Sequence, residues 1–213
     1  MNIVRSTFLV IAVMSINSCT LHKSSIPGTD LNPGRTREFT HKASGMTFPN
    51  AIGEFTRGRV HEHDDKGYNI SVGYDSDSFP LVTITVYVYP VDFLPPIGLS
   101  SEARAAYIVD QKNRMYIACK HDISNSHNDA ILVGEEEIQY NYDDSLYSGT
   151  HATYEFSVNH SGYFQPKISH LIFFPYVSDT WIVKYRITHN RDSSSSKARY
   201  QMFLDSFRWS FKG

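Results

Sequence analysis

Two histidines separated by one residue form the most suggestive polar cluster of the sequence, His61-Glu62-His63-Asp64-Asp65. On a strand, residues i and i+2 project from the same face, so these imidazoles could bind Zn²⁺ or Cu²⁺ together with Asp64 or Asp65. A complete site needs another ligand, and the candidates are five further histidines: His41, His151, His160, His170 and His189. The alternative is a solvated hairpin end, where polar residues commonly gather.

Several other catalytic motifs are absent from the sequence. It contains no Gly-x-Ser-x-Gly elbow, which would hold a nucleophile in place, and no glycine-rich phosphate loop or His-Glu-x-x-His. The run Glu135-Glu136-Glu137 could supply acids, but like charges on a strand more often protect an exposed sheet edge. The sequence therefore favours binding over catalysis, and we expect no catalytic residue and no cofactor.

Tyrosines are the candidates for a binding surface. Tyr87 and Tyr89 alternate with valines along one predicted strand, and Tyr140 and Tyr142 lie close together near another. Such rings offer a large contact area with little loss of conformational freedom. The alternative is that helices or a neighbouring strand cover them.

The N-terminal segment has the pattern of an export signal. Arg5 precedes an apolar run of eleven residues, Ser6 to Ile16. This length suits a signal-peptide core of about 7–15 residues and falls short of the roughly 20 that a membrane-spanning helix needs.

The tetrad Ile16-Asn17-Ser18-Cys19 resembles the lipobox of bacterial lipoproteins. The resemblance implies a signal peptide over residues 1–18 and lipidation of the Cys19 thiol, with a conventional cleaved signal as the alternative. Two acyl chains would hold the protein firmly on a membrane. Thr20 follows the cysteine where an Asp would direct retention, so resemblance to enterobacterial sorting implies the outer membrane, facing the periplasm.

Composition points to one folded domain after a linker. The chain has 213 residues, of which 41% are hydrophobic and 20% charged, enough to bury an ordinary core. Residues 19–47 are rich in Ser, Thr, Gly and Pro, which predicts a flexible tether before a domain over 48–213. The net charge is −2 and the basic residues are scattered, so we expect no nucleic-acid partner.

Hydrophobic periodicity predicts the elements of this domain. Alternation predicts seven strands, over 55–61, 68–74, 82–89, 131–142, 151–158, 167–175 and 180–188. Ser100 should cap a helix over 101–118, and Ser193–Ser196 should cap a last helix in which Tyr200, Phe203, Leu204 and Phe207 form an apolar stripe. We therefore expect an α+β fold, an antiparallel sheet of about seven strands with two helices packed on it.

That order of elements and the closing Phe203-Leu204-x-Ser206-Phe207-x-Trp209 resemble the PsbP-like fold over about 48–211. Extrinsic photosystem proteins and many small bacterial lipoproteins share this fold. The resemblance implies a fold and an envelope location more than an activity.

Together these features predict an envelope-anchored lipoprotein that acts as a non-catalytic binding or accessory protein, such as an immunity or assembly factor. Its partners would be the membrane, through the lipid anchor, and another envelope protein. The alternative is a periplasmic metal-binding protein or hydrolase that uses the His61/His63 hairpin.

Overall fold

The computed structural model describes residues 28–31, 37–91, 95–142, 145–175, 177 and 180–211. Nine strands form one antiparallel sheet in the order β1-β5-β6-β7-β11-β10-β9-β8, with β4 paired to β5. Short strands β2 (Phe39–Thr40) and β3 (Thr47–Phe48) form a separate pair. The nine are β1 (Thr29–Leu31), β4 (Ala51–Ile52), β5 (Phe55–Glu62), β6 (Ile70–Ser76), β7 (Val82–Pro90), β8 (Ile131–Tyr142), β9 (Ser145–His160), β10 (Tyr163–Phe174) and β11 (Trp181–Asn190).

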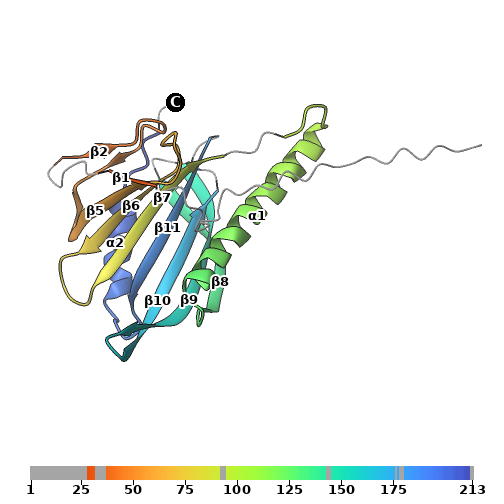
Figure 1. Ribbon diagram of the computed structural model, residues 1–213. Coiled ribbons are helices and arrows are strands. Elements are labelled where there is room, and N and C mark those ends of the chain that lie inside the picture. The colour runs from red at the N-terminus through yellow and green to blue at the C-terminus, as the bar shows by residue number, and fades with distance from the viewer. Residues whose placement is uncertain are drawn as a thin grey trace, which may run out of the picture.

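The two helices lie on opposite faces of the sheet (Figure 1). α1 (Ser101–Ser126) packs on the face formed by β9, β10 and the ends of β7 and β11, where Tyr89, Tyr154 and Phe173 are buried. α2 (Ser196–Ser206) covers the other face, which holds the larger of the two apolar cores. Each strand contributes alternate side chains to the two faces, so both faces are packed.

α1 begins at the predicted N-cap and ends later than expected. The Ser100 hydroxyl accepts a hydrogen bond from the backbone N–H of Ala103 at 3.2 Å. Met115, Cys119 and Ile123 recur every four residues and are buried against the sheet. Because Ile123 continues this stripe, the helix runs to Ser126 instead of ending near residue 118, and the polar residues of its last turns face outward.

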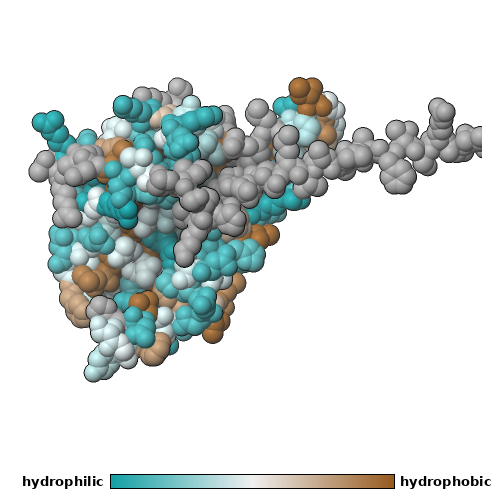
Figure 2. All heavy atoms as spheres, viewed as in Figure 1, coloured by the Kyte–Doolittle hydropathy of each residue, from teal (hydrophilic) through white to brown (hydrophobic). Residues whose placement is uncertain are grey.

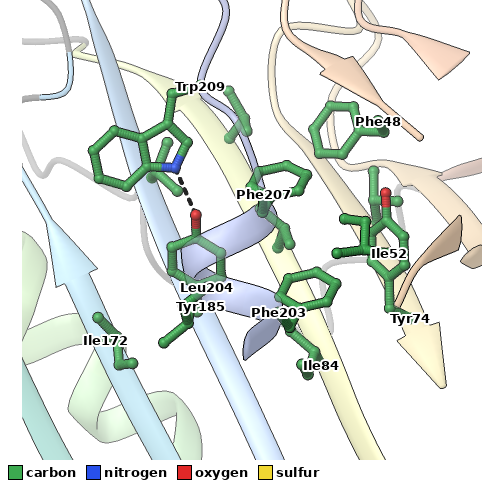
Figure 3. Packing of buried hydrophobic residues seen from close by; sticks show 14 of the residues in the cluster. Phe48, Ile52, Tyr74, Ile84, Ile172, Tyr185, Phe203, Leu204, Phe207 and Trp209 are labelled. Atoms are coloured by element: carbon green, nitrogen blue, oxygen red, sulfur yellow. Dashed lines mark hydrogen bonds between the residues drawn. The ribbon is translucent and has the colours of Figure 1, made fainter. Parts of the chain in front are cut away.

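The C-terminal stripe forms the centre of the larger core, as predicted. Phe203 and Phe207 stack with ring centroids 5.7 Å apart, and Phe203 meets the ring of Tyr74 at 5.0 Å (Figure 3). Both phenylalanines are almost fully buried. Burying one such side chain stabilises the fold by about 1.5–3 kcal/mol, so this stripe fixes α2 to the sheet.

The expected α+β class with about seven strands is wrong. The sheet has nine strands, and most of the ordered elements are strands, with helices of only 26 and 11 residues. The two extra strands, β1 and β4, have three and two residues, too few for an alternation to be recognised. β9 also extends to Ser145, since its backbone pairing with β8 continues as far as Tyr142 and Ser145. The fold is an open, mainly antiparallel β structure.

The segment expected to be a tether contributes to this structure within residues 28–31 and 37–47. β1 pairs with β5, and Met46 is fully buried. The buried Arg57 side chain donates hydrogen bonds to the carbonyls of Arg37 and Phe48, each at 2.6 Å. These contacts make residues 37–48 part of the folded domain, which therefore begins before residue 48.

Candidate functional site

A pocket of about 250 Å³ opens between α2 and strands β8 to β11. Its floor and walls are apolar and mostly aromatic: Ile138, Tyr140, Ile172, Phe174, Tyr185, Tyr200, Leu204 and Trp209. Figure 3 shows Ile172, Tyr185, Leu204 and Trp209 around the same region of the core. An apolar cavity with a few polar groups at its edge is the usual form of a small-molecule site.

Alternation along the strands places these walls. Ile172 and Phe174 on β10 point to the α2 face, while Leu171 and Phe173 point to the α1 face. Trp209 follows α2 and lies 5.0 Å from the ring of Phe174. The pocket thus forms where the chain after α2 closes over the sheet.

Two hydrogen bonds hold the aromatic walls. The Trp209 indole donates to the Tyr185 hydroxyl at 2.5 Å, and the Tyr140 hydroxyl donates to the Leu204 carbonyl at 2.5 Å. Burial raises the pKa of Tyr140 to about 12 and the pKa of Tyr185 well above its ordinary value. Both phenols therefore keep their hydroxyl protons at any physiological pH, and Tyr140 donates its proton while Tyr185 accepts from the indole.

The rim of the pocket is polar: Glu136, Gln139, His151, Lys197 and Gln201. Lys197 is exposed on the first turn of α2, and none of the ion pairs of the described residues includes it. The rim therefore offers a cation, amides and a carboxylate that is already engaged by a histidine.

That histidine begins a continuous chain of contacts across four strands, which we call the histidine row: Glu136, His151, His170 and His189. His151 Nδ1 lies 3.2 Å from Glu136 Oε1, and His151 Nε2 lies 2.9 Å from His170 Nδ1. His170 Nε2 lies 3.2 Å from His189 Nε2. His189 Nδ1 ends the row 2.8 Å from the carbonyl oxygen of Asn190.

α2 covers the buried end of the histidine row. The ring of Tyr200 lies 5.0 Å from that of His170 and 6.1 Å from that of His189, between centroids. Burial, reinforced by His151, His189 and Lys197, lowers the pKa of His170 to about 3. Burial also lowers the pKa of His189. Both imidazoles are therefore disfavoured as cations.

The structure brings together the two histidines of the predicted metal site. The rings of His61 and His63 lie 4.6 Å apart on β5 and just after it. His61 Nδ1 donates to Asp30 at 2.8 Å, and His63 Nε2 lies 2.9 Å from the hydroxyl of Ser71. Burial lowers the pKa of His63 to about 4, with His61 and Lys184 adding to the effect. Each imidazole thus has a protein partner.

The five proposed additional ligands do not complete this site within the described residues. His41 binds the Ser44 hydroxyl and the Gly67 carbonyl, both at 2.7 Å. His151, His170 and His189 belong to the histidine row on the other face, and the side chain of His160 lies outside the described part. Across the described residues, no three His, Cys, Asp or Glu side chains are grouped as a metal site.

The four candidate tyrosines do not form one surface. Tyr87 and Tyr89 lie on the α1 face, where Tyr87 stacks on His63 and Tyr89 is buried 3.6 Å from the Cys119 sulfur. Tyr140 and Tyr142 lie on the α2 face and pack on Trp209 at 5.5 Å each. Tyr89 and Tyr142 are buried, Tyr87 is half-buried, and Tyr140 lines the pocket beneath α2.

The predicted signal peptide and the predicted lipidation residue Cys19 lie outside the described residues. Within the described part, neither helix has the length and apolar character that crossing a membrane requires.

Sequence reasoning missed the pocket and the histidine row. The histidines of the row follow one another at intervals of 19 residues, one on each of three consecutive strands. Their shared face could have been inferred from alternation, since His151 is out of phase with Ala152, Tyr154 and Phe156 on β9. Their contact depends on strand register, which alternation does not give.

No protein-family model matches this chain, and no curated protein matches it either. The functional proposal therefore depends on the fold and on the geometry of the pocket.

Proposed function

We propose that this chain is an envelope-anchored lipoprotein whose domain is a non-catalytic binding protein, with the pocket under α2 as its ligand site. The observation that carries the binding role is the pocket itself, about 250 Å³ with aromatic walls and polar groups only at the rim. An apolar ligand body would gain by leaving water for these walls, at about 25 cal/mol for each Å² removed.

The positive charge of Lys197 at the rim indicates which chemical class of ligand the pocket would bind. Glu136 Oε1 lies 3.2 Å from His151 Nδ1, while Lys197 has no acidic partner among the described residues. A molecule with a small apolar body and one acidic group would bury the body against Trp209 and place the acid near Lys197. Charged hydrogen bonds of this kind add orientation to the apolar contact.

The arrangement supports binding more than group transfer. Among the described residues that line the pocket, none is a serine or cysteine that could act as a nucleophile. The rim imidazole of His151 is already committed to Glu136 and His170.

The envelope location is proposed from the sequence. The short apolar run and the resemblance of residues 16–19 to a lipobox support acylation of Cys19, which would place the domain in the periplasm beside other envelope proteins. There it would act as a ligand-dependent accessory to one of them. Palmitate labelling of the full chain should be strong, and Cys19→Ala should remove it. Labelling that persists in Cys19→Ala would contradict the anchor.

Calorimetric titration tests the binding role with three matched probes: octanoate, octanol and octylamine. We expect saturable binding of octanoate and weaker binding of the other two. Lys197→Ala should weaken octanoate binding by about two- to fivefold, the effect of one exposed charge pair. The control Lys66→Ala, on the turn before β6, should have no effect. No saturable binding of any probe would contradict the pocket as a binding site.

A further inference from the structure

A second pocket, of about 380 Å³, lies between residues 39–43 and the turn that joins β5 to β6. Leu31 on β1 also lines it, and β1 and β2 lie at the same end of the molecule (Figure 1). This volume falls within the range of small-molecule sites, about 300–1,000 Å³. Among the described residues, none lines both this pocket and the pocket under α2, so the two cavities are separate.

His41 joins the two sides of the second pocket. Its Nε2 lies 2.7 Å from the carbonyl oxygen of Gly67, which can only accept a hydrogen bond, so this nitrogen carries the proton. Its Nδ1 then accepts from the Ser44 hydroxyl, also at 2.7 Å. Burial lowers the pKa of His41, which favours this neutral form. The ring therefore holds residues 39–43 against the turn and is not itself free to bind a ligand.

Asp64 fixes the shape of the turn that forms the other side. Its Oδ1 accepts hydrogen bonds from the backbone N–H groups of Lys66 and Tyr68, at 2.9 Å and 3.0 Å. Its Oδ2 accepts from the backbone N–H of Asn69 at 2.6 Å. The backbone that carries Lys66 and Tyr68 is therefore held in place before any ligand arrives.

Gly67 makes room in this turn for the Glu62 carboxylate. The residue has a φ of +65°, a conformation that glycine adopts readily. A Cβ at this position would lie only 2.9 Å from Glu62 Oε1, so any other residue would push the carboxylate aside. Glu62 thus reaches the pocket through a contact that requires glycine.

The charged side chains of this pocket are an acid and two amines: Glu62, Lys42 and Lys66. Both lysines are exposed, and none of the three groups belongs to an ion pair within the part of the chain that the structure describes. Opposite charges therefore line one cavity without pairing with each other. Beside them, Leu31 and Phe39 are half-buried and Tyr68 is 48% exposed, which gives the pocket an apolar surface.

We propose that the second pocket binds a small zwitterion with an apolar body, the chemistry of an α-amino acid with an aromatic or aliphatic side chain. The ligand ammonium group pairs with Glu62, its carboxylate with Lys42 or Lys66, and its body packs on the apolar surface. Hydrogen bonds between charged groups are stronger than neutral ones and fix orientation. A simple acid leaves Glu62 without a partner, and a simple amine leaves both lysines without one.

This site is independent of the proposed ligand site under α2. Octanoate carries no ammonium group for Glu62, so its binding under α2 does not involve the second pocket.

Calorimetric titration of the full chain tests the zwitterion with three probes that share a phenyl ring: phenylalanine, phenylpropionate and phenethylamine. The second probe lacks the ammonium group and the third lacks the carboxylate. We expect saturable binding of phenylalanine and at least about two- to fivefold weaker binding of each analogue, the effect of one exposed charge pair. Absence of saturable phenylalanine binding would overturn the proposal, and so would equal affinity for the three probes.

Two variants locate the site, because each should affect one analogue only. Glu62→Gln should weaken phenylalanine binding by about two- to fivefold without weakening phenylpropionate binding. Lys42→Ala should weaken phenylalanine binding similarly and leave phenethylamine binding unchanged. A change in folding would weaken all three probes together, so this opposite dependence reports on the charges themselves.

Glu137→Gln on β8 and Lys197→Ala on α2 are the matched controls, since neither residue lines the second pocket. Both controls should leave phenylalanine affinity unchanged. Loss of affinity in Lys197→Ala, with none in Glu62→Gln, would place the zwitterion under α2 and overturn the inference.

Discussion

The indole nitrogen of Trp209 donates a hydrogen bond to the hydroxyl of Tyr185 at 2.5 Å, in the buried region between the sheet and the chain that follows α2 (Figure 3). Tyr185 is 1% exposed and Trp209 is 7% exposed, so water cannot replace this bond easily. The contact closes one wall of the pocket and joins the C-terminal segment to β11.

Trp209→Phe should lower the free energy of unfolding by about 1–3 kcal/mol, because it removes the hydrogen bond and part of the buried ring. Tyr185→Phe should cost a similar amount, since it leaves the indole N–H buried without its acceptor. Chemical denaturation of both variants and of the double variant measures the coupling between them. A coupling energy near zero would show that the bond contributes nothing.

Arg57 should stabilise the segment before β3. Arg57→Met removes two charged hydrogen bonds to backbone carbonyls and should lower the free energy of unfolding by about 2–4 kcal/mol. The matched control is Arg59→Met, which removes an exposed ion pair with Asp30 and should cost much less. Equal losses in the two variants would contradict this role of Arg57.

Ser100 should contribute as the N-cap of α1. Ser100→Ala should cost about 1 kcal/mol, as is typical for loss of such a cap, whereas Ser101→Ala within the helix should cost less. Thermal unfolding of the two variants compares them directly. The prediction fails if Ser101→Ala is the more damaging change.

Acid should destabilise the protein through His170. Its pKa is lowered from 6.5 to about 3 in the folded state, so below pH 6.5 the unfolded chain binds protons that the folded chain excludes. The free energy of unfolding should therefore fall as the pH decreases from 6.5 towards 3, by about 2 kcal/mol at pH 5 from this group alone. His170→Gln should flatten this dependence, and the control His121→Gln on the exposed side of α1 should not.

The alternation of apolar and polar residues predicts some elements of this fold and misses others. The strand 131–142 has the predicted bounds, and the stripe containing Phe203 and Phe207 packs as expected. The fold class was misjudged because strands such as β4, with two residues, are held by pairing with a neighbour and carry no pattern of their own. The position of an element of this kind depends on the partner that it pairs with.

The candidate site depends even more on features that the alternation of residues does not predict. The spacing of His61 and His63 correctly places two rings together, because His61 lies near the end of β5 and His63 directly follows it. The pocket and the histidine row combine residues from four strands and α2, so they depend on register and on how α2 crosses the sheet. Neither quantity is encoded in local periodicity.

The hydropathy of single residues does not indicate which of them form a binding site. The face of the molecule seen in Figure 2 mixes hydrophilic and hydrophobic residues among its coloured atoms. The apolar site lies beneath α2, and several of its walls, such as Tyr200 and Leu204, are residues that sequence analysis assigns to the core.

The central claim is that a small acidic ligand binds in the pocket under α2, and closing the mouth of that pocket tests it most directly. Gln201 is exposed at the rim, so Gln201→Phe should block entry without altering the core, while Gln165→Phe on β10 serves as the control. Calorimetric titration with octanoate should show at least about a tenfold loss of affinity, or about 1.4 kcal/mol, for Gln201→Phe alone. Equal affinity in the two variants would show that the ligand binds elsewhere.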